Sequence, residues 1–186
     1  TPRSSSAASD VYKRQEDVVG AAHTRFEHVK ELVDARPALA RSVWDWGFGD
    51  WESALGAASH MGRRDIAELL ISHGARPNLF TLTMMGKLDA VKKIVEAMPG
   101  IQRTLGPHGL TLMQHAQAAM RHTDKMSAAE KTEMEATVAY LESLGDAGIG
   151  QKSLEITDEE KKSYLGTYRV EGVGSSMDIL IELNRR

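Results

Sequence analysis

The sequence predicts a mainly α-helical fold, in which about four helix-turn-helix pairs stack into a solenoid and a short C-terminal β hairpin follows. Three observations support this prediction. Short apolar stretches alternate with turn residues over residues 16–145. The clearest of them holds two helices that are each too short to be stable alone. Over residues 157–186 the polarity partly alternates, which is typical of strands.

The clearest helical pattern lies in residues 51–78. A first short helix opens at Ser53 and ends at Gly62, where a left-handed C-terminal cap is expected. A second helix follows, and Gly74 ends it, with Pro77 shortly afterwards. The second helix carries a broad apolar stripe formed by Ile66, Ala67, Leu69, Leu70 and Ile71. A stripe of this width indicates a helix buried by neighbours on both sides.

These residues resemble an ankyrin repeat. Residues 53–56 (Ser-Ala-Leu-Gly) lie where that family has Thr-Pro-Leu-His, Gly62 takes the turn between the helices, and residues 73–78 (His-Gly-Ala-Arg-Pro-Asn) match the terminal signature. The opening tetrapeptide lacks the proline and the histidine of the family pattern. The resemblance implies a non-catalytic module that binds a protein or peptide.

Weaker copies of the pattern continue on both sides. Residues 17–37 predict an earlier pair with its turn at Arg25, and Gly86 marks the turn of a later pair. Residues 106–119 open another pair. Residues 127–130 (Ser-Ala-Ala-Glu) form a capping box that begins the longest helix, which Gly145 ends. We therefore expect an ankyrin repeat array over residues 16–145.

Both ends of the chain receive separate predictions. Residues 5–15 (SSAASDVYKRQ) resemble the translation of a sequencing adapter, so we expect residues 1–15 to be an artefactual or disordered tail. The native N-terminus is then missing, and the compartment, cytoplasmic or exported, stays undetermined. Residues 146–156 are expected to be a linker. Residues 157–186 are expected to be a truncated β-rich segment with strands over residues 164–169 and 177–183.

Composition excludes several classes of function. The net charge of -3 and the pI near 6.2 provide no basic field for nucleic acid or an anionic membrane. No apolar run approaches the roughly 20 residues of a transmembrane helix. The absence of cysteine excludes disulfides and thiolate chemistry. Since the sequence also lacks a phosphate-binding loop, a nucleophile elbow and an HExxH motif, we expect no cofactor and no catalysis in the repeat array. An enzyme activity carried by the missing termini stays an open alternative.

The connection between the first two helix pairs, residues 38–51, is rich in aromatic residues. It holds all three tryptophans, Trp44, Trp46 and Trp51, with Phe48 between them. One interpretation is a partner-binding surface, because binding hot spots favour tryptophan. The other, slightly favoured, is a lid that covers the apolar end of a repeat. We expect Trp51 to be structural, and Trp44 and Trp46 to be partly exposed and available to a partner.

The seven histidines do not show the spacing of a metal site. We compared His23 with His28, His60 with His73, and His115 with His122. No pair has both a suitable spacing and a nearby carboxylate, so hydrogen bonding at surfaces and loops is the expected role. We predict no metal. Besides binding of an unidentified protein or peptide, an alternative function is small-ligand binding or an enzyme-accessory role, with a pocket formed by residues 38–51 and a missing C-terminal domain.

Overall fold

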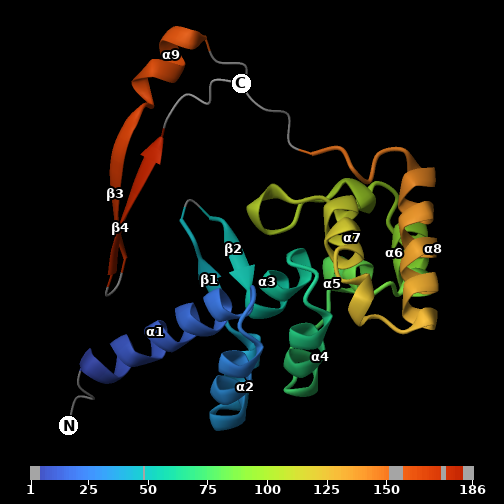
Figure 1. Cartoon of the computed structure of the whole chain (residues 1–186), viewed down its shortest axis with the longest axis horizontal. Helices are drawn as coiled ribbons and strands as arrows, with labels where there is room; N and C mark the ends of the chain where they lie inside the picture. The colour runs from blue at the N-terminus through green and yellow to red at the C-terminus, as the bar shows by residue number, and fades with distance from the viewer. Residues whose placement is uncertain (1–4, 48, 151–156, 173–174, 182–186) are drawn as a thin grey trace. The chain divides into compact units, whose positions relative to one another are not determined.

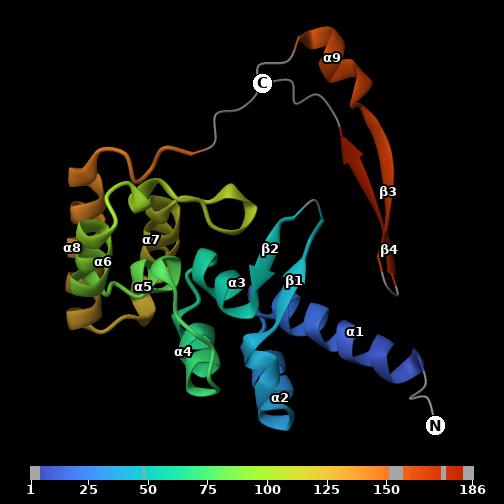
Figure 2. The same cartoon turned by 180° about the vertical axis from the view of Figure 1, so that it is seen from behind.

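The computed structural model describes residues 5–47, 49–150, 157–172 and 175–181. The chain divides into two compact units, Thr1–Gln151 and Lys152–Arg186. Each unit is described by itself. Within the described residues the fold is mainly helical, as the sequence predicts (Figures 1 and 2).

The first unit is built from pairs of helices whose members contact each other. In chain order the α-helices are α1 (Ser5–Ala21), α2 (Phe26–Ala35), α3 (Ala54–His60), α4 (Arg64–Ser72), α5 (Leu79–Met84), α6 (Leu88–Ala97), α7 (Leu112–Met120) and α8 (Ala128–Leu144). The first helices of successive pairs also contact one another, α1 with α3, α3 with α5, and α5 with α7. Short 3₁₀ turns lie between them: η1 (Pro37–Arg41), η2 (Ile101–Arg103), η3 (Pro107–Gly109) and η4 (Thr123–Lys125).

Local capping signals define where these helices begin and end. The Ser53 side chain accepts a hydrogen bond from the backbone N–H of Gly56 at the start of α3. The predicted capping box of Ser127 and Glu130 is present at the start of α8. Gly62 and Gly145 adopt positive φ where the sequence predicts helix ends. The core of the unit is continuous from α1 to α8, and its largest fully buried side chains include Ile66, Leu70, Met84, Leu112 and Met134.

The aromatic connection forms a short antiparallel hairpin of β1 (Val43–Asp45) and β2 (Trp51–Ser53). Trp44 faces Glu52 across the two strands. Because successive side chains of a strand point to opposite faces, Glu52 points into the protein and its neighbour Trp51 points outward. The hairpin contacts both α1 and α3, which brings Glu52 close to the ends of these helices.

The second unit contains a short helix and a β hairpin. Helix α9 (Asp158–Ser163) begins at a capping box of Thr157 and Glu160. Strands β3 (Gly166–Gly172) and β4 (Ser175–Ile181) pair in antiparallel register, with Gly166 opposite Ile181. The two predicted strands are therefore present, displaced by a few residues, and the end of the second prediction lies outside the described residues.

Two expectations about boundaries need correction. The expected disordered tail is helical from Ser5, because its Ala, Lys, Arg and Gln residues favour extension of α1. The side chains of residues 11–14 are exposed, and burial begins at Val18. The adapter origin of this stretch stays a prediction. The expected linker also begins too early, since Ala147 is buried and accepts a hydrogen bond from the N–H of Met113. Residues 151–156 lie outside the described residues.

No helix in the described parts of the chain combines the length and apolar character that crossing a bilayer requires.

Candidate metal centre

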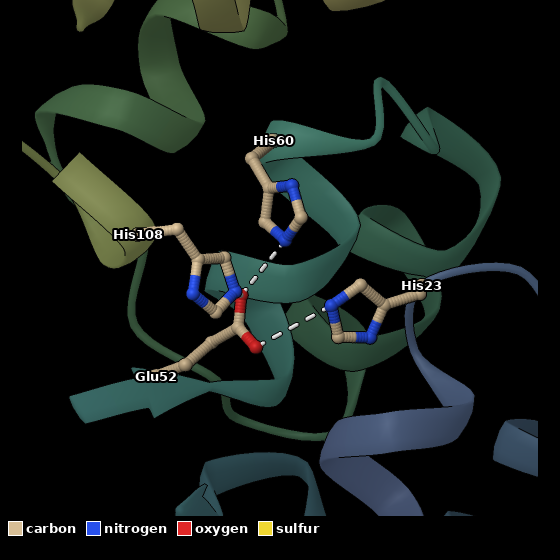
Figure 3. Close-up of side chains that lie close together, drawn as sticks. All are labelled: His23, Glu52, His60 and His108. Carbon is tan, nitrogen blue, oxygen red and sulfur yellow. Dashed lines mark ion pairs between the residues drawn. The ribbon is translucent and has the colours of Figure 1, made fainter. Parts of the chain in front are cut away.

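Four polar side chains from distant parts of the chain meet at one point in the first unit (Figure 3). His23 follows the end of α1, Glu52 belongs to β2, His60 is the last residue of α3, and His108 lies in η3. Each offers one ligand atom, and the four atoms lie within 4.8 Å of one another. We call this group the histidine–glutamate centre.

The Glu52 carboxylate lies in the middle of the centre and is fully buried, at 0% exposure. Its Oε1 is 2.8 Å from Nε2 of His60 and 3.4 Å from Nε2 of His108, and its Oε2 is 3.4 Å from Nε2 of His23. Trp46 donates a hydrogen bond from its indole N–H to Oε2, at 2.7 Å. All three imidazoles thus present the same nitrogen to one carboxylate, and the four groups lie close enough together to hold a metal ion.

The closest contact of the centre is the ion pair between Glu52 and His60. Glu52 Oε1 and His60 Nε2 are both buried, and neither atom has a hydrogen-bond partner among the described residues, although they lie only 2.8 Å apart. Buried polar atoms are nearly always paired, so such atoms require an explanation. A cation between them would satisfy both lone pairs at once.

The far sides of two imidazoles are held by the protein. Nδ1 of His23 donates to the carbonyl oxygen of Gly20 at 3.1 Å, and Nδ1 of His108 donates to Oδ2 of Asp50 at 2.6 Å. These bonds place the proton on Nδ1 and leave a lone pair on Nε2, which faces Glu52. Metal-bound histidines commonly have such a partner on the other ring nitrogen.

Asp50 holds the backbone of His108 as well as its ring. The backbone N–H of His108 donates to Oδ1 of Asp50 at 2.9 Å. This hydrogen bond, together with the contact to the ring, holds the pKa of Asp50 below its ordinary value. His108 has φ 58° and ψ 21°, and is the one non-glycine residue with positive φ among the residues that the structure describes. Strained backbone of this kind persists where the surroundings fix it, often at ligand-binding sites.

Burial and local contacts also set the charge states around the centre. Burial by itself raises the pKa of Glu52, but the neighbouring His60 ring and the Trp46 hydrogen bond outweigh it and lower the pKa, so the carboxylate is ionised. Behind His60 lies the buried His115, whose ring centroid is 6.5 Å away. Burial lowers the pKa of His115 to about 4. His115 is therefore neutral near pH 7 and supplies no compensating positive charge.

The tryptophans predicted as a partner site have three different environments. Trp44 is half-buried and packs against the core. Trp46 is 42% exposed, but its N–H binds Glu52 and its ring lies 6.4 Å from that of His23. Trp51 is 62% exposed, so the expectation that it is structural was wrong, because it alternates on β2 with the inward Glu52. Phe48 lies outside the described residues.

Spacing along the chain does not reveal the centre, and no metal site was predicted. His23, His60 and His108 come from three separate segments and share a carboxylate from a fourth. One local signal was available, since Glu52 is an acidic residue between Trp51 and the apolar start of α3. An acidic side chain there must be either exposed to solvent or paired with another group. Because side chains alternate between the two faces of a strand, an outward Trp51 places Glu52 inward, where it must be paired.

Comparison with protein-family models, curated proteins and solved structures found no match in any of the three.

Proposed function

We propose that the first unit binds one divalent transition-metal ion, of which Zn²⁺ is the best fit, at the histidine–glutamate centre. The observation that carries this proposal is the convergence of four ligand atoms, three imidazole nitrogens and one carboxylate oxygen, within 4.8 Å. Zinc is bound by imidazole and carboxylate at about 2.0–2.2 Å. Calcium and magnesium prefer sites made of oxygen ligands alone, which this centre is not.

A cation also accounts for the buried charge. An ionised carboxylate without a compensating charge is costly to bury. The ion pair of His60 and Glu52, with 2.8 Å between Nε2 and Oε1, involves only two of the four groups of the centre. The Nδ1 bonds of His23 and His108 leave Nε2 of each ring as the atom that faces Glu52 and can bind a metal. A metal ion satisfies all four groups together.

Calorimetric titration of the metal-stripped full chain with zinc tests the proposal. We expect one ion per chain, and we expect Glu52→Gln and His60→Ala each to weaken binding at least tenfold, since each removes a ligand. The control is His28→Ala, because the His28 side chain is about as exposed as that of His108 and lies outside the centre. Absence of binding in the parent chain, or equal binding by the ligand variants, contradicts the proposal.

A second function, binding of a protein or peptide by an ankyrin-like solenoid, is supported by different observations. Successive helix pairs contact one another, and the hairpin β1–β2 exposes Trp51 beside the exposed Val43. Exposed tryptophans are frequent anchors at interfaces.

Trp51→Ala is the cleanest test of this second function, since it leaves the centre intact, whereas Trp46 is bound to Glu52. We expect Trp51→Ala to leave the melting temperature unchanged and to reduce recovery of a specific partner in pull-downs with the full chain. Recovery of the same proteins by the parent chain and the variant argues against the hairpin as the binding surface.

A further inference from the structure

We infer that the metal ion at the histidine–glutamate centre keeps an open coordination position on its solvent side, where a small anion such as hydroxide, azide or a carboxylate binds. This inference rests on the proposed metal binding and adds the class of ligand that the ion takes.

The spacing of the three imidazole rings indicates how many positions the protein fills. The ring centroid of His60 lies 4.9 Å from that of His23 and 5.1 Å from that of His108. The centroids of His23 and His108 are 6.5 Å apart. With metal–nitrogen distances of about 2.0–2.1 Å, two imidazoles at a tetrahedral angle have centroids about 5 Å apart, and two opposite imidazoles have centroids about 6.4 Å apart.

These separations do not fit a closed tetrahedral site, in which all three would be near 5 Å. Bound through Nε2, His23 and His108 would lie on nearly opposite sides of the ion, with His60 between them. The 2.8 Å between Glu52 Oε1 and His60 Nε2 agrees with two neighbouring ligands at about a right angle. Two opposite ligands and two neighbouring ones would describe a five- or six-coordinate ion. Because Oε2 of Glu52 accepts the Trp46 hydrogen bond, the carboxylate would bind through Oε1 alone, and at least one position would be left for a ligand from solution.

Burial identifies the side on which that position lies. Glu52 is fully buried and the side chain of His60 is 9% exposed, so these two form the floor of the centre. The side chains of His23 and His108 are 25% and 34% exposed and flank the carboxylate on either side (Figure 3). The position opposite the floor therefore faces solvent. Sites with an open position are the type in which zinc binds water or substrate.

The charge of the centre favours an anion at the open position. One carboxylate and three neutral imidazoles leave a net positive charge on a divalent ion. A bound ion also lowers the pKa of a coordinated water, to about 7 on zinc in favourable sites, so hydroxide is itself a candidate ligand. The flanking rings restrict the opening, which favours small ligands over large ones.

Cobalt substitution with an azide titration tests the inference on the full chain. Co²⁺ replaces zinc, and its visible absorption reports coordination number, with intense bands for four ligands and weak bands for five or six. We expect weak bands that change in a saturable way as azide is added. If azide does not change the cobalt spectrum, the inference of an open position is wrong, whether the cobalt bands are weak or intense.

The same experiment separates this inference from the proposed metal binding. If the chain takes up no cobalt and no zinc, the metal proposal itself fails. If it binds cobalt one to one but ignores azide, the metal proposal stands and the open position is wrong. Glu52→Gln and His60→Ala should lose the cobalt bands together with the azide response, which excludes cobalt at other histidines. His28→Ala should retain both.

Discussion

At the scale of single residues, Asp50 is the group that positions His108. It binds both the backbone and the ring of a residue whose backbone conformation is unfavourable for any side chain with a Cβ. Asp50 would act on a bound ion only through its hydrogen bonds to His108. It is therefore a positioning residue, and its effect should appear in metal affinity rather than in the number of ions bound.

We predict that Asp50→Ala lowers zinc affinity about 10- to 100-fold, the usual range for loss of a group that orients a ligand. Asp50→Asn should also lower affinity, although it can keep the backbone bond. Its amide would donate to Nδ1 and so move the imidazole proton to Nε2, which blocks the ligand atom. Competition with a chelator measures the zinc affinity of both variants. Unchanged affinity in both would show that Asp50 does not position His108 for metal binding.

Gly62 and Gly74 allow the cost of an unfavourable backbone conformation to be compared with and without a steric clash. Gly62 and Gly74 have φ of 72° and 90°, so alanine is unfavourable at both. At Gly62 a Cβ would also lie 2.3 Å from the carbonyl oxygen of Ala118, whereas at Gly74 nothing lies within 4 Å. We expect Gly74→Ala to cost about 1–2 kcal/mol of unfolding free energy and Gly62→Ala clearly more. Urea denaturation of both variants tests this. Equal losses of unfolding free energy would show that the backbone near Ala118 moves away from the new Cβ at no cost.

At the scale of elements, α4 shows how far the sequence alone could predict the fold. Its apolar stripe and the glycines at either end are local signals, and they placed the helix within a residue or two. The capping boxes of α8 and α9 are local in the same way. The centre is not, because the Asp50–His108 contact joins residues 58 apart in sequence and depends on how whole helices pack.

We predict that Leu70→Ala lowers the unfolding free energy by about 2–5 kcal/mol, since Leu70 is fully buried in the core. Leu69 lies on the same helix but is only partly buried, so Leu69→Ala should cost less. From the apolar stripe alone, both leucines are expected to be buried and to cost about the same. Thermal or urea unfolding of the two variants compares their losses of stability. A larger loss for Leu69→Ala would mean that α4 turns Leu69, and not Leu70, toward the core.

At the scale of the whole molecule, the two units should respond differently to metal. The four residues of the histidine–glutamate centre belong to the first unit, and the described residues of the second unit contribute none. A ligand that binds only the folded state stabilises it by mass action, by about 2.7 kcal/mol when its free concentration is 100 times the dissociation constant.

We therefore predict that zinc slows amide hydrogen exchange in α1, α3 and the hairpin β1–β2 and leaves exchange in β3 and β4 unchanged. Exchange followed by mass spectrometry with and without zinc makes the comparison within one sample. Glu52→Gln should remove the effect. Uniform slowing across both units would mean that zinc acts through something other than this centre.

The position of His108 in the chain also determines the order in which the centre can assemble during folding. His23, Glu52 and His60 all lie within the first third of the chain, so three ligands can meet as soon as α1, the hairpin and α3 pack together. The fourth joins them when η3 docks against α3, a contact that closes a long loop of chain and therefore costs more entropy. An ion bound early by the first three residues would thus stabilise the docking of η3 through His108. Refolding in the presence of metal would then favour the native pairing of helices over a non-native one.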